Sequence, residues 1–354
     1  MLGLEGEMPA SILVYRNRDV YFQKAISDLQ IGEKSILARD AFQYVELWLN
    51  REGQRDALFY WQQARSFFLA SKALPPTSAP LTTYYCMLNA VKTLLAVKNI
   101  KYKEWHGVSG SGVQSRKSID NEITELHNAG VMAELSRYLK EPETAKVHTL
   151  SAILSNLPFL HRAYSLTKGL RSELFVGIHN VSYVRHPTLN KVWFSAEVHG
   201  QDADGRILAH IPPAFETDNR GEKLIIRKKA RVDWFARQGA SDVEKERAMK
   251  RFQTYHQKTR LDVVPISAPM GLWYLKRRIA SIPAINRYGL TLMMMGMHRL
   301  SELARYDPKG LSAHLAGKSN WLLTEFIELS PSQFIDEIAC EITGLEFRMP
   351  GVRA

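Results

Sequence analysis

Arg251 and His256 are five residues apart in a basic stretch of the chain, a spacing that suits chemistry on a phosphate ester. A guanidinium group can hold a phosphate, and an imidazole can exchange a proton with a ribose hydroxyl or a leaving oxygen. Five residues make about one and a half helical turns, so the two side chains share a face only if the helix ends or bends between them. The pair suits either a metal-independent ribonuclease site or a chance match in a chain with 11 histidines.

His106 is a second candidate for acid–base chemistry. It follows an apolar helical pattern and begins a run of small residues that ends at Gly112. The run is similar to a phosphate-binding loop only in composition, because no Gly-Lys-Ser/Thr follows it. We expect a loop here, in which His106 either contacts a ligand or packs against the end of the preceding helix.

His298, Glu302 and Arg305 form a polar stripe in an otherwise apolar stretch. Their spacing of four and three residues puts them on one face of a helix. Such a stripe can orient a catalytic or binding group, but an acid and a base on one helical face more often make a modest surface pair, which is the interpretation we favour.

Residues that bind common metals and cofactors do not gather in the sequence. The 11 histidines are scattered, and neither Cys86 nor Cys340 belongs to a Cys-x-x-Cys pair. The chain also lacks a Walker loop, a dinucleotide-binding glycine pattern and a nucleophile elbow. We therefore expect neither a metal site nor a cofactor.

Positive charge is concentrated in residues 221–290. The whole chain has 47 Lys and Arg against 36 Asp and Glu, a net charge of +11. Residues 221–290 hold 16 Lys and Arg and 6 Asp and Glu, which is +10 and leaves +1 for the remaining 284 residues. A local excess of this kind is typical of a nucleic-acid-binding surface, although a solvated helix face would also produce it.

Aromatic residues alternate with the basic ones in the same stretch. Trp234 and Phe235 follow one basic run, and Trp273 and Tyr274 precede another. Cations neutralise phosphates and exposed rings stack on unpaired bases, so the pattern favours RNA or single-stranded DNA; the alternative is that the rings belong to the core. The predicted nucleic-acid-binding residues are Arg227, Lys228, Lys229, Arg231, Lys250, Lys258, Arg260, Lys276, Arg277 and Arg278.

The elements that must position these residues are mainly helices. Apolar residues at three- and four-residue spacing predict helices, and alternating residues rich in Val, Phe, Trp and Tyr predict strands. The predicted helices are 41–49, 57–74, 80–97, 119–139, 150–163, 241–259, 269–280, 290–306, 321–329 and 331–343. The predicted strands are 174–184, 191–198, 206–211 and 223–231.

This order of elements predicts an α+β fold that is mostly helical and carries a small antiparallel β insert. We divide the chain into an N-terminal segment, residues 1–53, a helical region, 54–170, a β-rich insert, 171–235, and a C-terminal helical region, 236–354. Two cysteines cannot supply a disulfide framework, and no signal peptide or spanning apolar run is visible, so we expect a cytoplasmic protein with no membrane partner.

Several short patterns in the helical region occur in a fixed order. Tyr60-Trp-Gln-Gln-Ala64 and Phe67-Phe68 are followed by Ser78-Ala-Pro-Leu81, Tyr84-Tyr85, Leu88-Asn89 and Lys92. After them come His106-Gly107, Leu150 to Pro158 and Leu303 to Pro308, with the helices at 326–338 behind them. Together these patterns resemble the YaaC-like family of bacterial proteins. The resemblance covers about residues 57–340 in order and implies no particular biochemical role.

The pattern Tyr-Tyr-x-x-Leu-Asn-Ala-x-Lys-x-Leu-Leu, which begins at Tyr84, is also similar to the second helix of HEPN domains, helical modules of many RNA-acting toxins and phage-defence proteins. This similarity implies a HEPN-like helical core. Because active HEPN ribonucleases carry an Arg followed by a His, it also bears on Arg251 and His256.

Three hypotheses follow from these observations. The first is a nucleic-acid-binding protein, RNA-directed, of a bacterial defence or stress system. The second is a metal-independent HEPN-type ribonuclease that uses Arg251 with His256, or His106 in their place. The third is a non-catalytic subunit whose basic face docks on an acidic protein partner, and a homodimer is compatible with all three.

Overall fold

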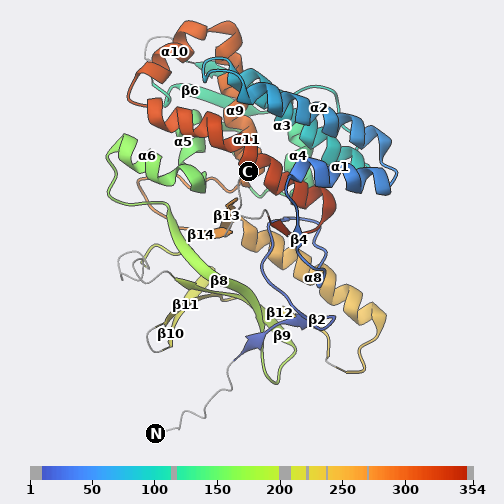
Figure 1. Cartoon of the computed structure of the whole chain (residues 1–354). Helices are drawn as coiled ribbons and strands as arrows, with labels where there is room; N and C mark the ends of the chain where they lie inside the picture. The colour runs from blue at the N-terminus through green and yellow to red at the C-terminus, as the bar shows by residue number, and fades with distance from the viewer. Residues whose placement is uncertain are drawn as a thin grey trace.

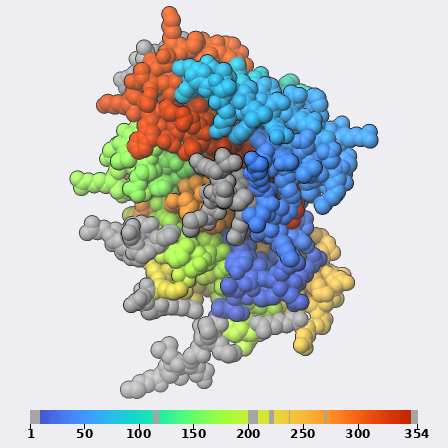
Figure 2. All heavy atoms as spheres, viewed as in Figure 1, coloured from blue at the N-terminus to red at the C-terminus, as the bar shows by residue number. Residues whose placement is uncertain are grey.

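The computed structural model describes residues 10–112, 118–198, 209–220, 223–236, 238–268 and 271–348. Figure 1 shows a helical lobe at one end of the molecule and a β-sheet lobe at the other. Figure 2, from the same side, shows the dark-blue N-terminal residues lying on the surface between the two lobes. The mixed α+β class expected from the sequence is confirmed, since helices and antiparallel sheets are both extensive.

The helical lobe consists of α1 (Ala41–Arg51), α2 (Arg55–Lys72), α3 (Ala79–Val97), α9 (Gly289–Tyr306), α10 (Pro308–Ala316) and α11 (Asn320–Thr343). Helix α3 lies at its centre and packs against α2, α9 and α11. Its residues Tyr84, Cys86, Met87 and Leu88 point in different directions around the helix and are all buried, as expected for a helix that neighbours cover on several sides.

A smaller group of elements follows α3: β5 (Val108–Gly112), β6 (Glu122–Leu126), α4 (Val131–Tyr138), β7 (Val147–Thr149), α5 (Leu150–Ser155), the 3-10 turn Pro158–Leu160 and α6 (His161–Lys168). The three strands form an antiparallel sheet in the order β5-β6-β7. The loop predicted at 106–112 is therefore partly a strand, and the helix predicted at 119–139 is a strand followed by a short helix. Strand β6 alternates buried and more exposed residues, which is the period of a strand.

The sheet lobe is an eight-stranded antiparallel sheet. Six strands follow the order β10-β11-β9-β8-β14-β13, while β1 pairs with β8 and β12 pairs with β9. Its strands are β1 (Ser11–Ile12), β8 (Phe175–Arg185), β9 (Lys191–Val198), β10 (Phe215–Arg220), β11 (Lys223–Lys228), β12 (Val232–Asp233), β13 (Val263–Ile266) and β14 (Leu272–Lys276). Strands from outside 171–235 thus complete the predicted insert.

Helix α8 (Asp242–Arg260) packs against one face of this sheet. The Ser241 hydroxyl accepts from the Glu244 amide and the Glu244 carboxylate accepts from the Ser241 amide, a capping box that fixes the start of the helix. Farther along, the Tyr255 hydroxyl oxygen accepts a hydrogen bond of 3.0 Å from the Phe194 amide of strand β9. Phe252 lies edge-on to Tyr183 of β8 at 4.5 Å.

The structure corrects three predictions in the C-terminal half. The helix predicted at 269–280 is replaced by β14, whose pairing with β8 and β13 outweighs its helix-like spacing. Of the strand predicted at 206–211, residues 206–208 lie outside the described part and 209–211 form a turn, while β10 was not predicted. The two helices predicted on either side of Ser330 are one helix, α11, with Pro331 inside it.

The N-terminal segment is fixed by α11 and by residues that follow it. Strand β15 (Phe347–Arg348) pairs in parallel with β4 (Ile36–Leu37). The buried Glu341 carboxylate accepts from the amides of Ile26 and Ser27. Both ends of the described chain therefore pack into the same core.

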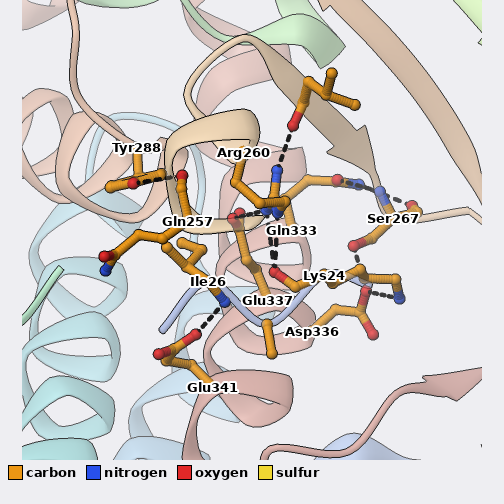
Figure 3. Close-up of polar contacts among 12 residues, drawn as sticks. Lys24, Ile26, Gln257, Arg260, Ser267, Tyr288, Gln333, Asp336, Glu337 and Glu341 are labelled. Carbon is orange, nitrogen blue, oxygen red and sulfur yellow. Dashed lines mark hydrogen bonds and ion pairs between the residues drawn. The ribbon is translucent and has the colours of Figure 1, made fainter. Parts of the chain in front are cut away.

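Arg260 is the largest charged side chain in the interior, with 1% of its surface exposed. Figure 3 shows its guanidinium between segments that are distant in sequence. It donates to the Lys24 carbonyl at 3.0 Å, to the Val263 carbonyl at 2.7 Å and to the Glu337 carboxylate at 2.8 Å. The end of α8, the N-terminal segment, β13 and α11 thus meet at one group.

Replacing Arg260 with Ala is expected to lower the free energy of unfolding by about 3–5 kcal/mol, because the change leaves Glu337 as an uncompensated buried charge. Urea unfolding measured by circular dichroism checks this. The matched change of exposed Lys258 on the same helix should alter stability by less than about 0.5 kcal/mol. Equal unfolding midpoints for the two variants would contradict the role given to Arg260.

Candidate functional site

Several of the cations predicted to bind nucleic acid lie in the interior. The buried ones are Lys228, Arg260, Lys276 and Arg277. Lys228 donates to the Thr259 hydroxyl at 2.9 Å, and Lys276 donates to the Ile285 carbonyl at 2.5 Å. A buried ammonium contacts no phosphate in this conformation. The prediction is therefore wrong for these four residues as surface groups, and their hydrophobic neighbours explain why sequence charge alone misplaced them.

Burial also changes the acidity of two of these lysines. It lowers the pKa of Lys276 to about 7, and the neighbouring Arg278 adds to the effect. It lowers the pKa of Lys228 to about 8. At neutral pH these lysines therefore supply less positive charge than the sequence count assigns to them.

The other predicted cations are exposed or partly exposed, and several have acidic partners. Arg227 and Arg231 each donate to Glu216 at 2.8 Å. In further ion pairs, Arg278 contacts Asp262 at 2.8 Å and Lys250 contacts Glu246 at 2.8 Å. Lys229 and Lys258 are exposed. Nucleic-acid contacts stay a prediction for these six residues.

The aromatic residues of the same stretch belong largely to the core. Trp234 is 4% exposed and stacks on Phe235 with ring centroids 4.7 Å apart. Trp273 is partly buried and lies edge-on to Phe22 at 4.9 Å. The alternative interpretation of these rings, as core residues flanked by charges, is the one that their positions favour.

Arg251 and His256 do not form a site together, because they lie on different faces of α8. Arg251 is exposed and His256 is fully buried. The His256 ring nitrogens contact the Tyr183 hydroxyl at 2.6 Å and the Ala25 carbonyl at 2.7 Å. Burial lowers the pKa of His256 to about 3, and Arg260 contributes to the shift. The structure therefore does not bring the predicted catalytic pair together, because five residues correspond to about one and a half turns of helix.

His106, by contrast, lies beside a second histidine. It follows α3, and its Nδ1 is 2.6 Å from the hydroxyl of Tyr84 on that helix. His298 on α9 has its ring centroid 5.8 Å from that of His106 and 4.9 Å from that of Tyr84. His106 is half-buried, whereas Tyr84 and His298 are buried. Two imidazoles and a phenol thus meet where α3 and α9 pack.

Close backbone packing fixes the segment that carries His106. The amides of Val131 and Met132, in the first turn of α4, donate to the carbonyls of Trp105 and His106 at 2.8 and 3.1 Å. A Cβ on Gly130 would lie 2.6 Å from the Gly107 backbone, and Gly130 has φ of +113°. Only glycine allows this approach, which holds His106 against α3.

The charges around the two histidines keep both rings neutral. Burial lowers the pKa of His106, Arg305 and Lys92 add to the shift, and Glu302 opposes it. Burial also lowers the pKa of His298 to about 3, and the neighbouring His106 adds to this shift. At neutral pH His106 is therefore an unprotonated imidazole close to two cations.

Glu302 is held in a chain of ion pairs on the same side of α9. Its carboxylate is 3.1 Å from Arg299 and accepts from the Gly110 amide at 3.2 Å. Arg299 in turn contacts Glu122 at 2.7 Å, and Glu122 contacts His314 at 2.9 Å. Glu302 of the predicted stripe thus connects α9 to β5 and, through Arg299, to β6, whereas Arg305 of the stripe is exposed.

Two exposed aromatic rings, one next to His106 in the sequence and one next to Arg305, each have a cation over them. Lys103 lies 4.9 Å from the ring centroid of Trp105, which is 65% exposed. Arg305 lies 4.9 Å from the ring of Tyr306, which is 78% exposed. We define the His106 surface as Lys92, Lys103, Trp105, His106, Arg305 and Tyr306.

Sequence reasoning identified some members of this surface but not their association. His106 and the 298–305 stripe were noted separately, and Trp105 and Tyr306 were missed. The sequence does contain a signal for these two rings, because each has a cation one or two residues before it. Lys103 precedes Trp105, and Arg305 precedes Tyr306. The contact between α3 and α9, which are about 200 residues apart, has no such signal.

Within residues 10–348, apart from the undescribed gaps, no group of three or more His, Cys, Asp or Glu residues is arranged to hold a metal ion. In the same described part, no helix is long and apolar enough to span a membrane. The groups that bear on function in the described part of the chain are the imidazoles of His106 and His298 and the exposed rings of Trp105 and Tyr306.

The sequence that folds into this helical lobe and antiparallel sheet matches a known protein family. The YaaC-like Protein family matches residues 20–342, most of the chain, and the protein belongs to this family. No curated protein and no solved structure matches it. The resemblance noted from Tyr60 onward is confirmed, while the HEPN-like core stays a prediction.

The neutral, buried His256 predicts a loss of stability in acid. Its pKa of about 3 lies below the ordinary value of 6.5, so the unfolded chain binds the extra proton and stability falls as pH drops from about 6.5 towards 3. Between pH 7 and pH 5 the expected loss from this group is about 2 kcal/mol.

Urea unfolding at both pH values checks this expectation. His256→Gln, which cannot bind the proton, should lose about 2 kcal/mol less than the wild type over the same interval. The exposed His127 serves as a control, and His127→Gln should leave the pH dependence unchanged. An identical pH dependence in wild type and His256→Gln would show that the imidazole is not held neutral.

Proposed function

We propose that this YaaC-like protein binds single-stranded RNA at the His106 surface and acts in a bacterial defence or stress system. The observation that carries the proposal is the pairing of exposed aromatic rings with cations beside a half-buried, neutral imidazole. The function is the one that we predicted, and the surface that supports it differs from residues 221–290.

The chemistry of the His106 surface suits an unpaired nucleic acid. Trp105 and Tyr306 offer π-faces for bases, and base–aromatic stacking contributes about 1–3 kcal/mol per base. Lys103 and Arg305 can neutralise phosphates, whereas Lys92 is paired with Glu104 at 2.6 Å. A neutral imidazole can accept a hydrogen bond from a 2′-hydroxyl, which is the group that distinguishes RNA from DNA.

Other partners stay open under this proposal. The partly exposed cations of residues 221–290, such as Lys229 and Lys258, supply a second basic region that could extend an RNA site or dock an acidic protein partner. A homodimer is compatible with either arrangement.

Trp105→Ala and Tyr306→Ala are each expected to weaken binding of a labelled 12-nucleotide RNA by roughly 5- to 100-fold, because each removes about 1–3 kcal/mol of stacking. Fluorescence anisotropy measures the affinity. Trp321→Ala, which removes an exposed tryptophan of α11, is the matched control and should leave binding unchanged.

The salt dependence tests the electrostatic part of the same proposal. Affinity should fall steeply as salt rises, and Lys103→Gln and Arg305→Gln should each reduce the slope of log K against log salt by about 0.7. Lys229→Gln reports separately on residues 221–290. Absent or salt-independent binding by the wild type would reject RNA binding.

A second function, metal-independent RNA cleavage, is favoured by the contact between His106 and Tyr84. If His106 Nδ1–H donates to the Tyr84 oxygen, Nε2 keeps its lone pair and can take the proton of a ribose 2′-hydroxyl. The 2′-oxygen then attacks the adjacent phosphorus, the bond to the 5′-oxygen breaks, and water supplies the proton to that leaving oxygen. Arg305, whose charge acts on His106, can stabilise the phosphorane charge.

Cleavage of this kind should persist in EDTA and require the 2′-hydroxyl, so a 2′-O-methyl RNA should bind and remain intact. His106→Ala should slow cleavage by about 10²–10⁴-fold, the usual contribution of a general base. Arg251→Ala, which alters the pair that the fold separates, is the control and should cleave normally. Unaltered cleavage by His106→Ala, measured on denaturing gels, would remove His106 from the reaction.

A further inference from the structure

A second cavity lies far from the His106 surface, at the junction of the N-terminal segment with the β13–β14 hairpin and α11. Its volume is about 200 Å³. Since roughly 10–15 Å³ of such volume holds one water, the cavity has room for a small organic molecule. A neighbouring cavity beside Arg260 and Lys276 measures only about 20 Å³.

The walls of the larger cavity carry excess negative charge. Asp19, Glu33, Asp336 and Glu346 contribute carboxylates, of which Glu33 pairs with Arg16 at 3.3 Å, and Lys24 contributes an ammonium group. Lys24 pairs with Asp336 at 2.6 Å and lies 3.9 Å from Glu346. Burial raises the pKa of Glu346, while Lys24 opposes the shift. Even with Glu346 protonated, the carboxylates outnumber the ammonium, so the cavity favours a cation.

Two buried oxygens of the cavity lack a hydrogen-bond partner among the described residues. Asp336 is 2% exposed, and its Oδ2 accepts from Lys24 and Ser267 while its Oδ1 accepts from no group. Figure 3 shows these contacts leaving from one carboxylate oxygen of Asp336. The Oε1 of Gln23 is also buried and without a donor. A buried acceptor without a donor costs free energy, so both oxygens suit a ligand with N–H groups.

The remaining wall is aromatic and apolar. Tyr21, Phe22, Leu272 and Trp273 line it, and Phe22 lies edge-on to Trp273 at 4.9 Å. Aromatic faces attract cations and also cover alkyl or ring surface. In the part of the chain that the structure describes, no cluster of His, Cys, Asp or Glu is arranged for a metal ion, which leaves an organic cation as the better fit.

The geometry points to a binding site for a small organic cation, a primary amine or guanidine whose N–H groups donate to Asp336 Oδ1 or Gln23 Oε1 while its apolar body contacts Trp273. The site is independent of the proposed RNA surface. A ligand bound there contacts the N-terminal segment, β14 and α11 together, and would stabilise the junction of the two lobes.

Isothermal titration calorimetry of the full chain with phenethylamine and agmatine as probes tests the site, with uncharged 2-phenylethanol as the matched control. Both amines should bind, and the alcohol should bind at least tenfold more weakly. Gln23→Leu should weaken amine binding at least fivefold because it removes an acceptor, and Gln23→Glu should tighten it because it adds a charge.

Asp336→Asn should weaken amine binding at least tenfold, whereas Glu328→Gln, an exposed change on the same helix, should have no effect. Because Asp336→Asn also alters the ion pair with Lys24, the unfolding curve of this variant is measured as well. If Asp336→Asn fails to fold, amine binding by the two Gln23 variants tests the site. Absence of amine binding at millimolar concentration would show a water-filled cavity and overturn the inference. So would equal binding of the alcohol, or affinities that do not respond to the Gln23 changes.

Discussion

The buried guanidinium of Arg260 is the group on which the arrangement of the two lobes depends. It satisfies carbonyls of the N-terminal segment and of β13 and pairs with Glu337 of α11, so a single charge orders three segments that share no local contacts. Burying such a pair gives little net stability, but removing one partner is very costly, so the contact acts mainly by excluding other arrangements. The amine cavity and the positions of β13 and β14 follow from it.

Net charge proved a poor guide to the surface of this protein. Residues 221–290 hold nearly all of the excess, yet four of their predicted binding cations lie inside the fold and others are neutralised by acidic partners. The cations that pair with exposed rings lie in the helical lobe, where the sequence is almost neutral overall. What a nucleic acid meets is the local arrangement of charge and π-surface, and a sum over sequence does not describe that arrangement.

The sequence predicts local structure well where periodicity is strong. The helices around Trp61, Tyr84 and Leu300 and the helix that begins after Ser241 are confirmed, because their patterns depend on neighbours one or two turns away. Strand β5, rich in Gly and Ser, and strand β14 were missed, since pairing with β6 forms the first and pairing with β8 and β13 forms the second. The candidate site was half predicted: His106 and His298 were both noted, but their contact depends on α3 packing against α9, and no spacing in the sequence encodes it.

The closure of the N-terminal segment by α11 has a consequence for synthesis. Lys24 meets Asp336 across 312 residues, and Ile26 meets Glu341 across 315. At a translation rate of about 5–20 residues per second, these partners emerge roughly 15–60 s apart. During that interval the amides of Ile26 and Ser27 and the ammonium of Lys24 have no native acceptor. The N-terminal segment therefore reaches its native position only after α11 has left the ribosome.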